Sequence, residues 1–145
     1  MSKIDVMRVR RILSEVREAK KVIGAILERT KDEFLTNTEA RYAARYAIVE
    51  MVEGAALAGS HVLEAKFGIV SESYTEVFSA LAKKGVISPS VGESLRRMTG
   101  LRNLVVHRYW EVDDSRIYDE AGGSGLGAVE KFIEEVSGYV EKEDA

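Results

Sequence analysis

Apolar residues recur every three or four positions through most of the chain, which is the period of one face of an α-helix. In the first stretch, from Asp5 to about Glu33, charged residues fill the positions between them. The apolar positions of this stretch are Val9, Ile12, Leu13, Val16, Ile23, Ile26 and Leu27. The pattern predicts one long amphipathic helix here.

A second helix is predicted from Thr36 to roughly Lys66. Thr36 and Glu39 have the spacing of a capping box, in which each side chain accepts a hydrogen bond from the other's backbone N–H. The stretch that follows is rich in alanine and contains Gly54 and Gly59. Such small residues let a neighbouring helix approach closely, so we expect tight packing in a helical bundle.

Two further start signals follow. Ser73 and Glu76 repeat the capping-box spacing ahead of a short helix that Gly85 would end. Ser88 and Pro89 open the next helix, because a serine hydroxyl can accept from a free first-turn N–H and proline fits the first helical position.

The last predicted helix has its apolar positions at Val129, Phe132, Ile133, Val136 and Val140. A loop through Asp113, Asp114 and the glycines at 122–125 is expected before it. The pattern thus predicts an all-α fold: an antiparallel helical bundle of about five helices. No repeat or second domain is evident, so residues 1–145 are expected to form a single domain.

Composition agrees with a helical globular protein. The chain has 145 residues, 46% of them hydrophobic, with one proline and no cysteine. A chain without cysteine has no disulfides, thiolate metal ligands or cysteine nucleophile. The charged N-terminus does not resemble a signal peptide, and no run of apolar residues is long enough to cross a bilayer. We therefore expect a cytoplasmic protein.

Charge is distributed unevenly along the chain. Residues 1–110 contain 18 Lys and Arg against 13 Asp and Glu, whereas residues 111–145 contain 3 against 11. Lys83, Lys84, Arg96, Arg97 and Arg108 gather in one segment of the basic part. These side chains can contact phosphates without reading a nucleic-acid sequence, although charge alone identifies no ligand.

Two further patterns have ordinary explanations. The residues from Gly123 to Ala128 fit the dinucleotide fingerprint G-x-G-x-x-G/A, but the strands and distant acidic residue that it needs are missing. A flexible loop is the better interpretation. Asp113 and Asp114 are adjacent carboxylates without further oxygen ligands at a defined spacing, so we expect solvated loop charges and no metal site.

Only two histidines exist, His61 and His107, and they do not form an H-x-x-x-H pair that would suggest a metal site. His61 is expected to be structural. His107 follows Arg102 and Asn103 in the sequence RNLVVHRY. If this stretch is helical, Asn103 and His107 share a face, and Arg102 and Tyr109, seven residues apart, nearly eclipse each other.

This group of side chains suits phosphodiester chemistry. A guanidinium such as Arg102 holds a phosphate through two hydrogen bonds, and a histidine such as His107 can move the proton of a 2′-hydroxyl near neutral pH. That chemistry requires no metal or other cofactor. The alternative is that the spacing arose by chance and Arg102 merely pairs with an acidic residue.

The segment from Arg102 to Tyr109 resembles the R-x4-H-x-Y signature of the HepT-like toxins, a branch of the HEPN superfamily of ribonucleases. The likeness extends to the stretch RYAARYAIVE at residues 41–50 and to residues 74–101, so it covers roughly residues 5–140. It implies a helical bundle that forms a homodimer, in which two copies of the motif meet at a shared cleft.

The resemblance also implies a role for each site residue. Arg102 and His107 would be catalytic, the arginine binding the scissile phosphate and the histidine acting as general acid or base during attack by the 2′-hydroxyl of RNA. Asn103 would help to position the phosphate or the imidazole. Arg108 is a further expected RNA contact.

The expected partner is a minimal nucleotidyltransferase antitoxin, which would neutralise the toxin by transferring AMP to Tyr109. The bulky anion would block the cleft and offset its positive charge. A rival interpretation is a non-catalytic helical subunit that only docks or holds substrate for a nucleotidyltransferase, because fold does not fix function. A nucleic-acid-binding bundle without cleavage is a third.

Overall fold

The computed structural model describes residues 3–144, and within them the chain forms helices and no strands. The α-helices are α1 (Val6–Ile26), α2 (Lys31–Thr36), α3 (Thr38–Val62), α4 (Tyr74–Lys83), α5 (Pro89–His107), α6 (Asp114–Glu120) and α7 (Leu126–Asp144). Three shorter segments are η1 (Leu63–Phe67), η2 (Tyr109–Glu111) and η3 (Ala121–Gly125). The predicted all-α fold is confirmed, and α1, α3, α4, α5 and α7 are the five expected helices.

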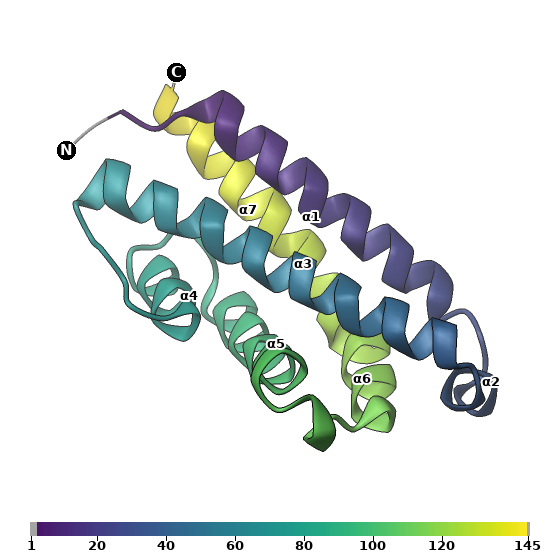
Figure 1. Cartoon of the computed structure of the whole chain (residues 1–145). Helices are drawn as coiled ribbons and strands as arrows, with labels where there is room; N and C mark the ends of the chain where they lie inside the picture. Colours follow the sequence, from purple (N-terminus) through teal and green to yellow (C-terminus); the bar gives the residue numbers. More distant parts are fainter. Residues whose placement is uncertain (1–2, 145) are drawn as a thin grey trace.

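The long helix α3 lies at the centre of the bundle. Figure 1 shows α1 running antiparallel to α3, with α7 alongside both, while α4 and α5 lie across the other side of α3. Every other α-helix makes contact with α3. The helix that carries the candidate motif, α5, is thereby held between α3, α4 and α7.

Small residues on α3 allow its neighbours to approach closely, as predicted. A Cβ atom built on Gly54 would lie 2.6 Å from a methyl group of Val16 on α1. One built on Gly59 would lie 2.6 Å from Leu81 and 2.9 Å from Val77, both on α4. These separations are shorter than van der Waals contact, so each glycine sets the distance between two helices.

The predicted boundary between the first two helices is wrong. The first helix ends at Ile26, and the capping box lies at Thr30 and Glu33, where it begins the separate helix α2. Thr36 is the last residue of α2, and its hydroxyl donates to the carbonyl of Asp32. Asn37 has an extended backbone and caps α3 by accepting from the N–H of Ala40 at 2.9 Å.

The signals around α4 and α5 are confirmed in part, because the Glu76 carboxylate accepts from the N–H of Glu72 where a full capping box would use that of Ser73. Ser73 accepts from the N–H of Glu76, and Gly85 follows the end of α4 with φ 75°, a left-handed conformation that glycine adopts readily. Ser88 precedes Pro89 but does not cap α5. Its backbone N–H and its hydroxyl both donate to the Glu135 carboxylate on α7 instead.

The expected loop over 113–125 is also wrong, because most of it is helical. Asp113 caps α6 by accepting from the N–H groups of Ser115 and Arg116. The glycine cluster forms the π-helical segment η3, which is kinked at Gly123 (φ −81°, ψ −110°) and continues directly into α7. Between α5 and α7, irregular backbone is limited to the residues on either side of η2 and to the kink at Gly123.

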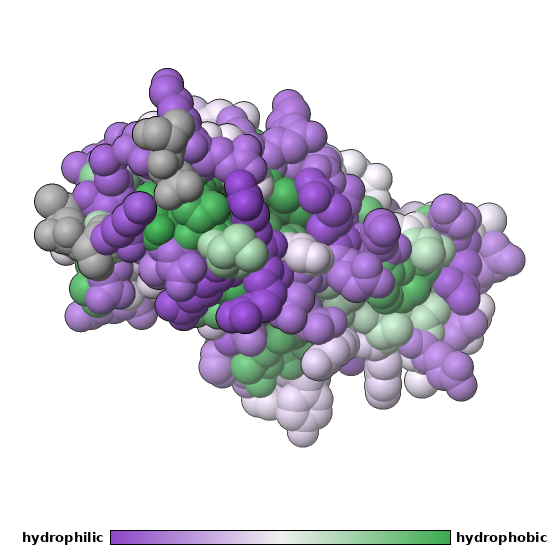
Figure 2. All heavy atoms as spheres, turned by 90° about the horizontal axis from the view of Figure 1, so that it is seen from above, coloured by the Kyte–Doolittle hydropathy of each residue, from purple (hydrophilic) through white to green (hydrophobic). Residues whose placement is uncertain are grey.

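The inner faces of the helices share one hydrophobic core. Its aromatic centre is an edge-to-face pair of Phe78 on α4 and Phe132 on α7, with ring centroids 5.8 Å apart. Seen from above the view of Figure 1, the outer surface is covered largely by hydrophilic residues, with apolar atoms showing between them (Figure 2). Among residues 3–144, no helix is both long and apolar enough to span a membrane.

We expect Gly59→Ala to lower the free energy of unfolding by about 1–3 kcal/mol, because the added methyl group overpacks the contact with Leu81 and Val77. Gly138→Ala on α7 is the matched control, since a Cβ there meets nothing within 4 Å. It should raise stability by up to about 1 kcal/mol through helix propensity alone. Urea denaturation of both variants checks this, and equal stabilisation by the two would contradict the close contact.

Candidate functional site

Arg102 lies on the face of α5 that packs towards α3, and its side chain is only 14% exposed. Its guanidinium donates to the Glu53 carboxylate on α3 through Nη2 at 2.7 Å and Nε at 3.2 Å. The ring of Tyr74, at the start of α4, lies against the guanidinium carbon with its centroid 4.7 Å away. Three helices therefore hold this arginine, and the acidic pairing raised as an alternative does occur.

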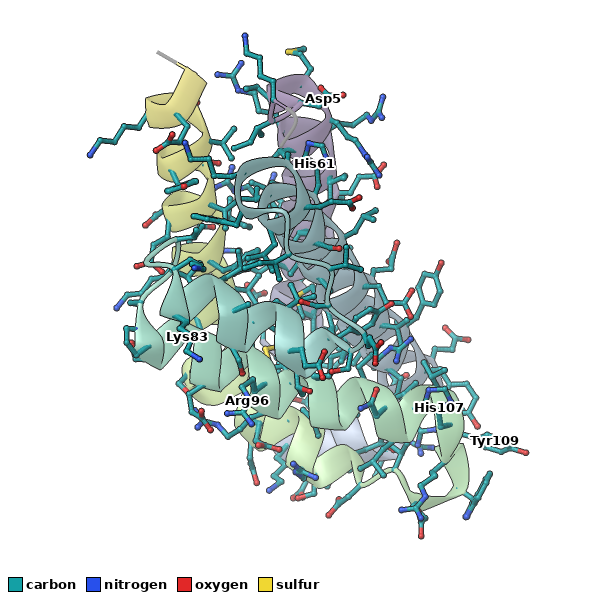
Figure 3. All side chains as sticks on the ribbon, turned by 90° about the vertical axis from the view of Figure 1, so that its left-hand side faces the viewer. Asp5, His61, Lys83, Arg96, His107 and Tyr109 are labelled. Atoms are coloured by element: carbon teal, nitrogen blue, oxygen red, sulfur yellow. The ribbon has the colours of Figure 1, made fainter. Side chains whose placement is uncertain are left out.

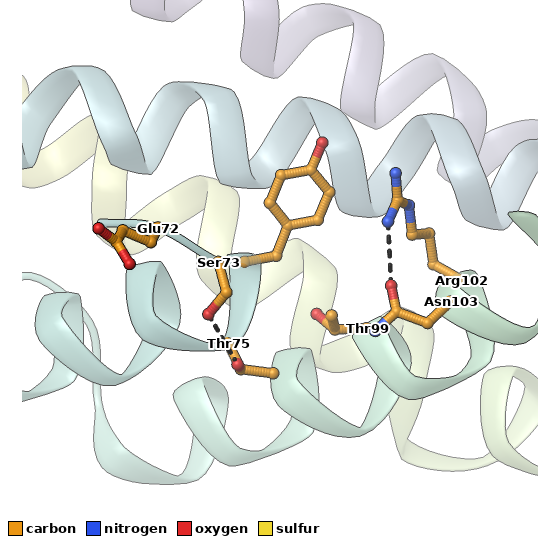
Figure 4. Close-up of a pocket in the computed structure, with 7 residues that line it drawn as sticks. Glu72, Ser73, Thr75, Thr99, Arg102 and Asn103 are labelled. Atoms are coloured by element: carbon orange, nitrogen blue, oxygen red, sulfur yellow. Dashed lines mark hydrogen bonds between the residues drawn. The ribbon is translucent and has the colours of Figure 1, made fainter. Parts of the chain in front are cut away.

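A surface pocket of about 280 Å³ opens beside this arginine. It is lined by Glu72, Ser73, Tyr74, Thr75, Thr99, Arg102 and Asn103. Figure 4 shows Arg102 donating through Nη1 to the Asn103 carbonyl oxygen at 2.9 Å, and the hydroxyls of Ser73 and Thr75 paired at 3.2 Å. The structure thus brings Arg102 and Asn103 together at an accessible polar hollow.

His107 is the last residue of α5, and its side chain is exposed. Because the helix continues to this point, Asn103 and His107 lie one turn apart on one face, as expected. Figure 3 shows His107 at the end of α5. His107, Arg108 and Tyr109 do not line the pocket beside Arg102, so a single chain does not bring the whole motif to one hollow.

The expected eclipsing of Arg102 and Tyr109 is wrong, because α5 ends before Tyr109. Arg108 leaves the helix with φ −141° and ψ 50°, and its exposed guanidinium pairs with Glu111 at 3.3 Å. Tyr109 begins the 3₁₀ turn η2 and is 67% exposed. Its ring packs edge-on against Trp110, with centroids 5.3 Å apart, and points away from the bundle (Figure 3).

Asp114 does not behave as a solvated loop charge. It is buried at the start of α6, where it accepts from Arg45 at 2.6 and 2.9 Å and from Arg41 at 3.3 Å. Burial alone would raise the pKa of this carboxyl, but the hydrogen bonds and positive charges of Arg45 and Arg41 outweigh burial and lower it. These ion pairs tie the segment that follows Tyr109 to α3.

The other histidine has a structural contact. The Nε2 atom of His61 accepts from the backbone N–H of Asp5 at 2.9 Å, and the Asp5 carboxylate caps α1. Figure 3 shows the two residues together, far from His107. This hydrogen bond joins His61 on α3 to the residue that caps α1.

The charge asymmetry of the sequence is partly neutralised within the chain. Carboxylates of α6 and α7 pair with cations of the first three helices: Asp119 with Lys31, Glu130 with Arg17 and Lys20, Glu141 with Arg10, and Asp114 with Arg41 and Arg45. Within residues 3–144, no carboxylate pairs with Lys83 or Arg97. Figure 3 shows Lys83 on α4, and Arg96 and His107 on α5.

Sequence reasoning missed Glu53, Tyr74 and the Asp114 cluster as neighbours of the motif. The partners of Arg102 come from other helices, and no local spacing relates them to it. Arg41 and Arg45 did carry a signal, because two arginines four residues apart on one helix face can share a single carboxylate. Nothing in the sequence indicated that the carboxylate would be Asp114.

The family described as "Ribonuclease HepT-like" matches residues 6–136. The chain belongs to that family. The resemblance inferred from the R-x4-H-x-Y segment is therefore confirmed. Among residues 3–144 of this HepT-like chain, no three histidine or acidic side chains are grouped so as to hold a metal ion.

Relatives of the HepT-like chain agree with this assignment. An Archaeoglobus fulgidus protein named "Putative RNase" is 27% identical, over 94% of this chain and 98% of that protein. A Bacillus subtilis cytosolic protein of unknown function, YutE, has a similar structure with a TM-score of 0.84 and 17% identity, covering 99% and 95% of the two chains.

A Shewanella oneidensis HEPN toxin, described as tri-AMPylated and in complex with an MNT antitoxin, superposes with a TM-score of 0.83. It is 19% identical, covering 92% of this chain and 98% of that one. At these identities the likeness establishes the fold. The HepT-like chain therefore has the fold of a HEPN toxin.

We expect Asp114→Asn in the HepT-like chain to lower the free energy of unfolding at pH 7 by about 1–3 kcal/mol, because two partly buried arginines lose their charged partner. Since folding lowers the pKa of Asp114, its stabilisation is present above the unfolded value near 3.8 and is lost as pH falls through the folded pKa. The difference between wild type and variant in urea denaturation should therefore shrink from pH 7 to pH 3.

Asp113→Asn is the control for that experiment. Asp113 is the N-cap of α6, and asparagine caps helices about as well as aspartate. A loss of stability as large in Asp113→Asn as in Asp114→Asn would contradict a specific role for the buried ion pairs.

Proposed function

We propose that the protein is a metal-independent endoribonuclease toxin, acting as a homodimer and neutralised when a minimal nucleotidyltransferase antitoxin transfers AMP to Tyr109. The proposal rests on the arrangement of the motif side chains on α5, in a chain that belongs to the HepT-like family. Arg102 and Asn103 border a polar pocket, and the exposed His107 lies one turn further along the same helix.

The chemistry follows from these side chains. The 2′-hydroxyl of one nucleotide attacks the adjacent phosphorus, the P–O2′ bond forms and the P–O5′ bond breaks, leaving a 2′,3′-cyclic phosphate and a 5′-hydroxyl. Arg102 stabilises the charge that develops on the phosphate oxygens, and Asn103 and Arg108 contact the phosphate groups. His107 moves the proton between the attacking and leaving oxygens as general acid or base.

Dimerisation is supported by the surface around the motif. Tyr46 and Leu57 on α3 and Val106 on α5 are between 41% and 66% exposed, so a second copy of the chain would bury apolar area here. A second copy packed on this surface would place a second His107 near the first pocket. The cleft between the two copies would then combine Arg102 and Asn103 of one chain with His107 of the other.

Modification at Tyr109 is supported by its exposure and by the Shewanella oneidensis toxin, which is described as tri-AMPylated. AMP attached to the Tyr109 hydroxyl places a phosphate beside Arg108 and His107. The added anion opposes the positive charge that attracts RNA and occupies the entrance to the motif. Localisation in the cytoplasm, where RNA and the antitoxin are found, follows from this function.

The principal alternative is a non-catalytic subunit that docks a nucleotidyltransferase or accepts AMP. A non-catalytic subunit would have the same fold and the same exposed Tyr109 as a ribonuclease, so only a test of RNA cleavage distinguishes the two functions. The enzyme is favoured because the pocket at Arg102 combines a guanidinium, an amide and hydroxyls, which suits a phosphate better than a protein surface.

We expect the unmodified protein to cleave single-stranded RNA in excess EDTA, and His107→Gln to slow cleavage by about 10²–10⁴-fold through loss of proton transfer. Arg102→Lys should slow it by about 10²–10³-fold, since lysine cannot replace the planar donor array. Single-turnover cleavage of a labelled oligoribonucleotide measures both.

His61→Gln is the matched control, because a glutamine oxygen can still accept from the Asp5 N–H. It should leave the cleavage rate unchanged. An unmodified, folded protein that cuts no RNA, and does not differ from His107→Gln, would favour the non-catalytic subunit.

We expect co-production with a cognate nucleotidyltransferase to add one or more AMP units to the chain, located at Tyr109 by peptide mass mapping. Tyr109→Phe should remain unmodified because it lacks the accepting hydroxyl. Tyr46→Phe removes a similarly exposed tyrosine hydroxyl on α3 and should still be modified. Modification that persists in Tyr109→Phe would exclude this residue as the acceptor.

A further inference from the structure

We propose that Glu53 is a positioning residue for Arg102, holding the guanidinium in the orientation that presents its free N–H groups to the scissile phosphate. The inference rests on the proposed ribonuclease activity and adds to it a residue outside the R-x4-H-x-Y segment. Glu53 lies 49 positions before Arg102, on α3.

The contact between the two side chains fixes the plane of the Arg102 guanidinium. The same carboxylate oxygen, Oε2 of Glu53, accepts from Nη2 at 2.7 Å and from Nε at 3.2 Å, so it lies at the edge of the guanidinium. The Tyr74 ring lies 4.7 Å from the guanidinium carbon and blocks movement on one side. The contact of Glu53 with the edge of the guanidinium and of Tyr74 with its face together remove most of the rotational freedom that a long arginine side chain has in water.

The remaining donors belong to a guanidinium that lines the pocket. A guanidinium has five N–H groups, of which Glu53 accepts two and Asn103 accepts a third. Within residues 3–144, the other two, one on each terminal nitrogen, have no hydrogen-bond partner. They are the pair of donors available to a phosphate, and their direction is set by the contact with Glu53.

The surroundings of Glu53 argue for a specific partnership. The carboxylate is 41% exposed, whereas the Arg102 side chain is 14% exposed. A mostly buried cation requires a nearby anion, and of the carboxylates in residues 3–144 only Glu53 lies within ion-pair distance of Arg102. Its neighbour Gly54 is pressed against Val16, so the backbone that carries Glu53 is itself held in place.

The proposal predicts that removing the charge of Glu53 has opposite effects on RNA binding and on the rate of cleavage. Glu53 places a negative charge beside the phosphate site, so its charge weakens RNA binding, while its geometry speeds the chemical step. Glu53→Gln keeps the size and removes the charge. The variant should have a lower kcat, by about 10–10²-fold for a misplaced phosphate donor, and an unchanged or lower KM.

The test uses the unmodified full chain from cell-free synthesis, with intact mass confirming that no AMP is attached. The probe is a labelled 20-nucleotide single-stranded RNA of mixed sequence, cleaved in excess EDTA. A DNA oligonucleotide of the same sequence, which has no 2′-hydroxyl, measures binding without cleavage. Glu50→Gln is the matched control, because it removes an exposed carboxylate one turn earlier on α3.

A second readout follows the guanidinium directly. The ¹H–¹⁵N signal of the Arg102 Nε–H, assigned by its loss in Arg102→Lys, reports the hydrogen bond to Glu53. It should shift and exchange faster with water in Glu53→Gln and stay unchanged in Glu50→Gln. Circular dichroism at the assay temperature establishes that each variant is folded.

The outcomes are distinct. A lower kcat without a higher KM, together with the displaced Nε–H signal, supports positioning by Glu53. If wild type cleaves RNA and Glu53→Gln cleaves it equally fast or faster, the carboxylate only competes with the phosphate and the proposal is overturned. A raised KM with unchanged kcat also overturns it, while absence of cleavage by wild type removes the proposed function itself.

Discussion

The close approach of other helices to α3 is the constraint on which the rest of the structure depends. Where α1 and α4 contact it, α3 presents glycine, and an added Cβ would meet side chains at less than van der Waals distance. Two faces of α3, one towards α1 and one towards α4, are thus committed to packing. The remaining surface carries Glu53, Arg41 and Arg45, which reach α5 and α6 through ion pairs. The packing of α3 therefore determines where the residues around the motif can lie.

Two sets of ion pairs hold the motif at its two ends. Glu53 fixes Arg102 five residues before the end of α5, and the buried Asp114 fixes the chain beyond Tyr109. Between them lie the exposed end of α5 and the short turn η2, which have few tertiary contacts. A firmly held arginine and a more accessible histidine and tyrosine suit the proposed site, in which Arg102 binds a phosphate and Tyr109 is modified.

The existence of the five main helices could be predicted from sequence because apolar periodicity reports burial directly. Their ends were harder to predict. Thr36 and Glu39 had the correct spacing for a cap, but Asn37 is the residue that caps α3. The segment after Asp113 was predicted to be a loop because it contains several glycines, which usually mark loops, yet it is helical. The motif residues could be named from their local spacing. Glu53 and Tyr74 could not, since their contacts with Arg102 exist only after three helices have packed.

The position of α7 in the chain has a consequence for the timing of folding. α7 completes the core behind α5, through Phe132 against Phe78, and its Glu135 holds the residue that precedes α5. The ribosome makes residues 126–144 only after the whole motif has been synthesised. A nascent chain that already contains Arg102 and His107 therefore has the contacts of α5 with α3 and α4 within its sequence, but still lacks the part of the core that α7 packs against α5.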